Sequence, residues 1–188
     1  MFSSDEHIDS LHELTFRLTD APTVQERALS YLLEVAGEDI TESDVRTVLG
    51  LPRSTTHMAL AALVRQGVVG RRQVGRTNIY AVDPEDPLVR SLKTAHAIRL
   101  VQNAISPLRE TLDTVVLFGS ASSGRGRRGS DIDILVVTAS VERALGELSR
   151  HQWLQPVVMT SGQHMQLIAE GGTFATEVAR GITIWERR

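Results

Sequence analysis

The sequence predicts an α+β protein with an N-terminal unit of three helices and a β-hairpin, a connecting helix, and a C-terminal small mixed β-sheet flanked by helices. Three observations predict this class. Apolar residues recur at helical spacing as far as Val64, strand-like segments begin after Gly67, and short apolar runs alternate with helical segments after residue 112. We expect four consecutive segments: an N-terminal extension over 1–22, and then 23–83, 84–112 and 113–188.

The first two predicted helices are defined by their capping residues. Thr23–Ala36 has apolar residues at helical spacing and is followed by a glycine, which suits a helix C-cap. A second, short helix is predicted from Thr41, because Asp44 stands three residues later as a shortened capping box. Gly50 is expected to end it.

A third helix and a hairpin complete the N-terminal unit. Pro52 enforces a turn, and Ser54 is expected to cap the third helix. The pattern then changes to strands over Val68–Val74 and Asn78–Val82, joined by a tight glycine-containing turn. Two prolines and three acids after the second strand mark a boundary.

The charges of the chain are segregated, although the formal net charge is only −3. Residues 1–39 carry nine acids and two bases, whereas residues 40–82 carry six arginines and two acids. A basic segment inside an acidic chain is typical of a local nucleic-acid contact. A solvated arginine-rich surface is the alternative.

Candidate DNA contacts lie at the start of the third helix and on the hairpin. Short polar side chains at the first turn of a recognition helix reach base edges or phosphates; here they are Arg53, Ser54, Thr55, Thr56 and His57. Hairpin arginines suit phosphate contacts; here they are Arg71, Arg72 and Arg76.

The segment from about Thr23 to Val82 resembles the winged-helix repressors of the ArsR and MarR type. The landmarks are the capped helix with Leu60 and Leu63, the basic pair after Gly67, and Tyr80 on the second strand. The resemblance implies that double-stranded DNA is a partner and that the chain acts as a homodimer. A winged helix used for protein contact alone is the alternative.

The C-terminal part is predicted as one long helix followed by short strands and helices. The helix covers Leu88–Leu112, and Pro107 is expected to kink or end it. The predicted strands are Val115–Phe118, Asp131–Val137, Leu154–Met159 and Ile182–Trp185.

The sharpest motif is a Gly119-Ser120 turn followed, after ten residues, by Asp131-Ile132-Asp133. On a strand, residues i and i+2 point to the same face, so the two carboxylates are expected to converge. Carboxylates this close favour a cation between them, as in Mg²⁺ sites that hold a triphosphate. Gly119 allows the backbone to approach a phosphate, and the Ser120 hydroxyl and nearby amides can bind its oxygens.

These residues resemble the signature of the minimal nucleotidyltransferases of the DNA polymerase β superfamily, over about Asp113–Arg188. The resemblance implies that Gly119 and Ser120 bind the phosphates of ATP or another NTP. It also implies that Asp131 and Asp133 are catalytic residues and ligands of Mg²⁺. Minimal nucleotidyltransferases often act as antitoxins beside a HEPN-type partner, which implies a possible protein partner.

One position departs from this family. Its catalytic members place a third carboxylate on the next strand, where this sequence has Gln155. A neutral amide is no general base and a poor Mg²⁺ ligand. The sequence therefore favours a DNA-binding transcriptional regulator whose nucleotidyltransferase-like domain binds NTP and Mg²⁺ with weak or absent transfer. The alternatives are an active nucleotidyltransferase with a protein or nucleic-acid acceptor, antitoxin-like, and an interaction module.

Composition excludes other classes. The chain of 188 residues has no cysteine, so disulfides and thiolate metal sites are excluded. It has no run of 18 apolar residues, and its polar start does not match a signal peptide. We therefore expect a cytoplasmic protein with no membrane contact.

Overall fold

The computed structural model describes residues 23–187, and the extension expected over 1–22 lies outside the described residues. The chain forms two compact units, and the boundary between them falls between Leu92 and Lys93, within one helix. The predicted α+β class is confirmed: helices accompany a small antiparallel sheet in the first unit and a four-stranded mixed sheet in the second.

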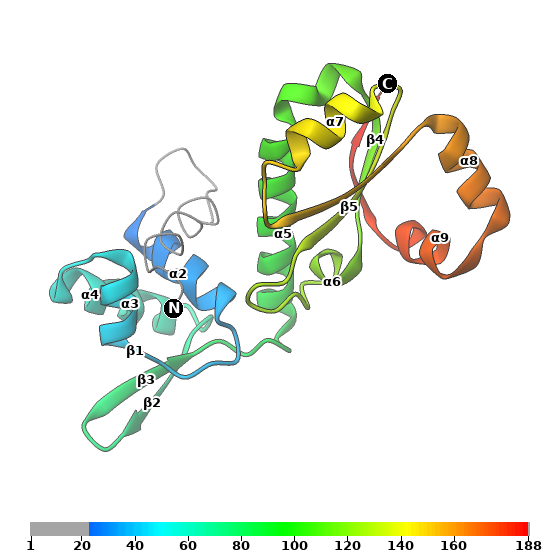
Figure 1. Cartoon of the computed structure of the whole chain (residues 1–188). Coiled ribbons are helices and arrows are strands. Elements are labelled where there is room, and N and C mark those ends of the chain that lie inside the picture. Colours follow the sequence, from blue (N-terminus) through cyan, green and yellow to red (C-terminus); the bar gives the residue numbers. More distant parts are fainter. Residues whose placement is uncertain (1–22, 188) are drawn as a thin grey trace, which may run out of the picture. The chain divides into compact units, whose positions relative to one another are not determined.

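Within residues 23–86, the first unit has three helices and three strands; Figure 1 shows how they are arranged. In chain order they are α2 (Val24–Glu34), β1 (Ile40–Thr41), α3 (Glu42–Leu49), α4 (Arg53–Arg65), β2 (Gly70–Val74) and β3 (Thr77–Ala81). The strands pair antiparallel in the order β1-β3-β2. The hairpin is therefore confirmed, and β1 is an additional two-residue strand that adjoins it.

Local capping explains where the helices begin and end. Thr41 and Asp44 form the predicted capping box at α3, and Gly50 ends that helix in the left-handed conformation. The expectation that Ser54 caps the third helix is wrong. The helix α4 begins one residue earlier, at Arg53, and Pro52 occupies the N-cap position without a side-chain hydrogen bond.

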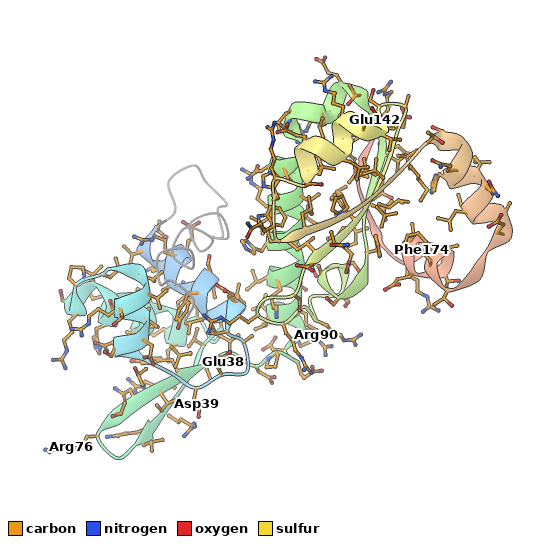
Figure 2. All side chains as sticks on the ribbon, viewed as in Figure 1. Glu38, Asp39, Arg76, Arg90, Glu142 and Phe174 are labelled. Atoms are coloured by element: carbon orange, nitrogen blue, oxygen red, sulfur yellow. The ribbon has the colours of Figure 1, made fainter. Side chains whose placement is uncertain are left out.

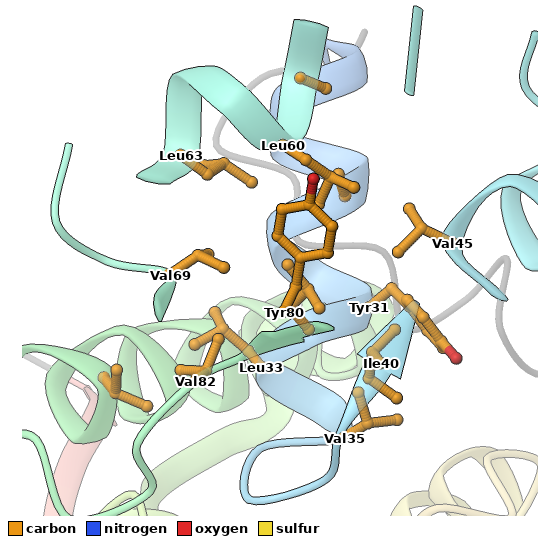
Figure 3. Packing of buried hydrophobic residues seen from close by; sticks show 14 residues of the cluster. Tyr31, Leu33, Val35, Ile40, Val45, Leu60, Leu63, Val69, Tyr80 and Val82 are labelled. Carbon is orange, nitrogen blue, oxygen red and sulfur yellow. The ribbon is translucent and has the colours of Figure 1, made fainter. Parts of the chain in front are cut away.

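The core of the first unit surrounds Tyr80 on β3 (Figure 3). Tyr80 is 1% exposed. It packs in one cluster with residues of α2, α4 and the strands, and the cluster includes Leu32, Leu60, Leu63, Ile40 and Val69. Burial is the main cause that raises the pKa of the Tyr80 hydroxyl. This core fixes the hairpin against the helix that carries the candidate DNA contacts.

The second unit begins within α5 (Pro87–Ala104) and contains four strands. After α5 come a 3₁₀ helix (Ser106–Thr111), β4 (Leu112–Leu117), α6 (Gly119–Ser122), β5 (Ile132–Thr138), α7 (Val141–Leu148), β6 (Leu154–Met159), α8 (Ser161–Glu170), α9 (Gly172–Ala179) and β7 (Ile182–Glu186). As expected, the long helix stops before Pro107, which lies in the first turn of the 3₁₀ helix.

The sheet of the second unit has the order β6-β5-β4-β7. The pair β5–β6 is parallel, and the other two pairs are antiparallel. In Figure 1, α5 and α7 lie on one side of this sheet, and α8 and α9 lie on the other. All residues of β5 from Ile134 to Thr138 are buried, so this strand is rigidly held between its neighbours.

The helix α9 packs on the face of the sheet that Asp133 shares. Phe174 and Val178, four residues apart on α9, join a cluster with Leu135 and Val137 of β5. Because alternate strand residues share a face, Asp133 points to the same side as these two. The helix therefore covers the face on which the candidate carboxylate lies.

Candidate functional site

The first turn of α4 presents most of the predicted DNA contacts to solvent. The Arg53 side chain is 86% exposed and the His57 side chain 57%. Ser54 is exposed and Thr55 half-buried. Thr56 differs from its neighbours: it is 0% exposed, and its hydroxyl donates to the Pro52 carbonyl over 3.1 Å. Thr56 stabilises the first turn from the core side, so we leave it out of the proposed DNA contacts.

An acidic side chain lies against this exposed turn. Glu42, at the start of α3, has one carboxylate oxygen 3.0 Å from His57 Nδ1 and the other 3.9 Å from Arg53 Nε. The sequence did not predict this contact, because Glu42 and His57 are 15 positions apart and meet only where α3 packs on α4. The carboxylate neutralises part of the positive charge that this surface offers to a phosphate.

The hairpin arginines differ in how they are held. Every residue of β2 is exposed, Arg71 and Arg72 included. Arg72 pairs with Asp39, and both side chains are 57% exposed. Arg76 lies in the turn between β2 and β3, and Figure 2 shows it at the tip of the hairpin, pointing away from the helices. Arg76 is therefore the hairpin cation best placed for a phosphate contact.

In the second unit, the Gly119-Ser120 turn lies directly against Asp133. The Phe118 amide donates to the Asp133 carbonyl over 3.0 Å, which aligns the end of β4 with the start of β5. Gly119 follows with φ +66°, and a Cβ there would meet the Asp133 carboxylate, 3.2 Å from its Cγ. Only glycine combines this left-handed backbone with such a close approach. The turn therefore lies next to the strand that carries the candidate carboxylate.

The loop that follows α6 folds back onto Ser120. Ser120 is half-buried at the second position of α6. Its carbonyl accepts from the Arg125 amide over 2.9 Å, and a Cβ at Gly126 would lie 3.6 Å from the Ser120 hydroxyl. The loop side chains Arg125, Arg127 and Arg128 are exposed.

The two aspartates interact electrostatically. Asp131 is exposed just before β5, and Asp133 is half-buried on the strand. Burial raises the pKa of Asp133, and the charges of Glu177 and Asp131 raise it further. Ionisation of Asp133 therefore lowers the folding stability. This loss develops as the pH rises through the ordinary Asp range, because the unfolded chain releases the proton at a lower pH than the folded chain does. A nearby cation offsets this cost.

Gln155 lies beside Asp133 on the neighbouring strand. In the parallel pair of β5 and β6, Asp133 is the register partner of Gln155, so the two side chains share a face. Gln155 is exposed. Between residues 151 and 169 the sequence has no acidic side chain.

Glu177 on α9 is an acidic neighbour of Asp133 that sequence reasoning missed. Phe174, three residues earlier, contacts Phe118 edge-on with ring centroids 5.5 Å apart. This contact holds α9 beside the turn, and the negative charge of Glu177 contributes to raising the pKa of Asp133. The i, i+4 pair Phe174 and Val178 is the signal that indicates a packed face of this helix.

The donor set fits a magnesium–nucleotide complex better than a metal ion alone. Within residues 23–187, no group of three His, Asp or Glu side chains converges as a metal cage. Mg²⁺ is commonly held by one or two carboxylates together with substrate phosphates and water. Asp131 and Asp133 are candidates for such carboxylates, and the Gly119 backbone lies directly against the Asp133 carboxylate. The same part of the chain contains no helix long and apolar enough to cross a membrane.

Comparison with known families agrees with this division of the chain. Residues 99–168 match the nucleotidyltransferase domain family, and residues 31–73 match the IclR helix-turn-helix domain family. The chain therefore carries a DNA-binding helix-turn-helix domain fused to a nucleotidyltransferase domain. The predicted combination is confirmed, with the helix-turn-helix assigned to the IclR type.

Several solved structures are similar to parts of the chain. A Sulfolobus solfataricus protein described as a nucleotidyltransferase is 23% identical with TM-score 0.35, covering 52% of this chain and 84% of its own. MepR, a transcription regulator of the Staphylococcus aureus efflux pump MepA, is 19% identical with TM-score 0.40, covering 58% and 87%. A toxin-antitoxin structure with AMP-PNP is 19% identical with TM-score 0.33, covering 48% and 74%. No curated protein gives a significant match.

The hairpin predicts a graded salt dependence of DNA binding. Arg76→Ala should lower the slope of log affinity against log salt by about 0.9, the value expected for one lost phosphate contact. Arg72→Ala should lower it less, because Asp39 already neutralises this guanidinium. Fluorescence anisotropy with duplex DNA between 50 and 200 mM salt, roughly the range used for such slopes, measures both values. Equal slopes for the two variants would contradict this assignment.

Gly119 provides a test of the turn. Gly119→Ala should lose Mg²⁺-dependent nucleotide binding, because its Cβ displaces the Asp133 carboxylate, and should lower folding stability by about 1–2 kcal/mol through left-handed strain. Gly129→Ala is the matched control: φ is +74° and a Cβ meets nothing within 4 Å. The control should lose similar stability but retain nucleotide binding. Thermal melting and isothermal calorimetry separate the two effects, and equal nucleotide affinities would refute the close approach.

Proposed function

We propose that this protein is a transcriptional regulator whose helix-turn-helix domain binds double-stranded DNA while its nucleotidyltransferase domain binds an NTP with Mg²⁺ and transfers nucleotidyl groups weakly or not at all. The observation that carries the proposal is the register of β5 and β6, which sets a neutral amide, Gln155, beside Asp133. The turn and the aspartates retain what binding needs, whereas this strand lacks a proton acceptor for transfer.

The nucleotide half of the proposal rests on four residues. Gly119 and Ser120 would bind phosphate oxygens through the backbone and the hydroxyl, and Asp131 and Asp133 would hold Mg²⁺ together with those oxygens. When bound, the metal ion neutralises phosphate charge and orients the chain of phosphates. ATP and the other NTPs share this triphosphate, so the four residues select the phosphates and not the base.

The DNA half rests on the exposed first turn of α4 and on the hairpin. Arg53, Ser54, Thr55 and His57 would reach base edges or phosphates, and Arg71, Arg72 and Arg76 would contact the backbone. Helix-turn-helix proteins commonly read two half-sites as dimers. We therefore propose a homodimer on DNA in the cytoplasm.

A second candidate function is active nucleotidyl transfer to a protein or nucleic-acid acceptor. The observation that favours it is Glu177, whose carboxylate approaches Asp133 from α9 instead of from β6. A carboxylate at that place would accept the proton of an attacking hydroxyl. The resemblance to minimal nucleotidyltransferases makes an antitoxin role beside a HEPN-type protein the form that this candidate takes.

Calorimetry tests the proposed binding activity directly. The full chain should bind at least one NTP in the presence of Mg²⁺ and much more weakly with EDTA. Asp131→Asn should weaken that binding because it removes a negative charge facing the cation, and it should leave DNA affinity unchanged because Asp131 lies in the other unit. Asp113→Asn, a change of the same type in the second unit, is the control and should bind as the wild type. Wild-type protein that binds no NTP with Mg²⁺ would remove the nucleotide half of the proposal.

A gain-of-function variant decides between the two candidates. Gln155→Asp places a proton acceptor beside Asp133 and should raise pyrophosphate release from labelled NTP, since general-base catalysis contributes about 10²–10⁴-fold. Gln155→Asn is the neutral control of matching size and should stay inactive. Rapid wild-type release that both Gln155 variants leave unchanged, and that Glu177→Gln abolishes, would instead establish the active enzyme.

A further inference from the structure

The chain contains a single lysine, and it lies against the loop that follows the Gly119-Ser120 turn. Lys93 is on α5, is half-buried, and its Nζ donates to the Gly126 carbonyl over 2.5 Å. Among the ion pairs of residues 23–187, none joins Lys93 to a carboxylate. Within these residues, the Gly126 carbonyl is the polar group that the Lys93 ammonium contacts.

The next residue of α5 holds the same region. The Thr94 hydroxyl lies 3.4 Å from the carbonyls of Ala121 and Ser122, which belong to α6. Lys93 and Thr94 thus attach α5 to the loop on one side and to the short helix α6 on the other. These contacts span 27 to 33 residues of sequence.

Gly126 connects Lys93 to the candidate phosphate site. A Cβ at Gly126 would lie 3.6 Å from the Ser120 hydroxyl, so the loop backbone passes close to that side chain. The Gly126 carbonyl meanwhile accepts from Lys93. The Gly126 segment therefore contacts the Lys93 ammonium through its carbonyl and also passes close to the Ser120 hydroxyl.

The environment of Lys93 favours an anion nearby. Burial lowers the pKa of the Lys93 ammonium, because part of its hydration is lost. A phosphate group bound at Ser120 would attract the Lys93 ammonium and stabilise its positive charge. Asp131 and Asp133, by contrast, repel phosphates unless a cation lies between them.

We propose that Lys93 is a positioning residue for the triphosphate: it holds the Gly126 segment against Ser120 and supplies positive charge behind the phosphate-binding turn. This inference rests on the proposed function, since it concerns the same nucleotide site. Lys93 acts through Gly126 and through the electrostatic field, and not by contact with the reacting phosphorus. The role requires both a hydrogen-bond donor and a positive charge.

Three variants of the full chain separate charge from structure. Lys93→Gln keeps a donor but removes the charge, Lys93→Arg keeps the charge, and Arg99→Gln removes a charge from an exposed position of the same helix. Each protein is titrated by calorimetry with Mg²⁺ and each of ATP, GTP, CTP and UTP. The monophosphate of the base that binds best is then titrated in the same way.

If the Lys93 charge acts on the phosphates, its removal should lower nucleotide affinity by an amount that depends on the number of phosphates. Lys93→Gln should weaken triphosphate binding by roughly three- to thirtyfold, as expected for one charge removed at several ångströms in a partly screened site. Monophosphate binding should change about twofold or less, Lys93→Arg should retain most of the triphosphate affinity, and Arg99→Gln should bind as the wild type.

The contrary outcomes are distinct. Unchanged triphosphate affinity in Lys93→Gln, or equal losses for triphosphate and monophosphate, would show that Lys93 is only a structural residue. A similar loss in Arg99→Gln would show a general effect of net charge. Either result overturns the inference while the proposed function stands. Wild-type protein that binds none of the four triphosphates overturns the proposed function, and the inference with it.

Discussion

The hydrogen bond from the Phe118 amide to the Asp133 carbonyl fixes the geometry of the candidate nucleotide site. It joins the end of β4 to the start of β5 over 3.0 Å, so the glycine that follows Phe118 must lie against the Asp133 side chain. The Phe118 ring in turn contacts Phe174, which places α9 and its Glu177 beside the same carboxylate. The turn, the aspartate and the covering helix are therefore linked by one backbone contact.

The surface that we propose to face DNA carries charges that are partly neutralised within the chain. Glu42 is shared by Arg53 and His57, and Asp39 pairs with Arg72. Exposed ion pairs of this kind contribute little to folding stability. Their effect is larger on binding, since a partly neutralised arginine releases fewer counterions when it meets a phosphate. On the proposed DNA-binding surface, these ion pairs would weaken non-specific attraction to DNA.

Local signals predicted the elements that depend on neighbouring residues. The Thr41–Asp44 capping box and the left-handed Gly50 follow from side chains three to nine positions apart, and the hairpin follows from its turn and strand pattern. Alternation along the predicted strand Asp131–Val137 also indicates that Asp131 and Asp133 lie close together; in the structure Asp131 precedes β5, and its charge contributes to raising the pKa of Asp133. In each case the determining contacts lie within one element or one turn.

Contacts between distant elements could not be predicted in the same way. Thr56 looked like a DNA contact because it belongs to a polar run, but the packing of α4 on the core turns it inward. Glu177 and Lys93 reach the candidate site across 44 and 33 residues. Neither stands within a recognisable motif, and only the pairing of strands and helices brings them to it.

The abundance of arginine over lysine has a practical chemical consequence. Of 20 basic residues, 19 are arginine, and cysteine is absent, so the side chains that react with common amine and thiol reagents are reduced to Lys93. An amine-selective fluorophore would modify the α-amino group and this one side chain. Because Lys93 is half-buried behind the Ser120 turn, its rate of labelling depends on the packing of that loop. Lys93 is thus the one side-chain amine available for labelling, and it lies in the second unit without any engineered residue.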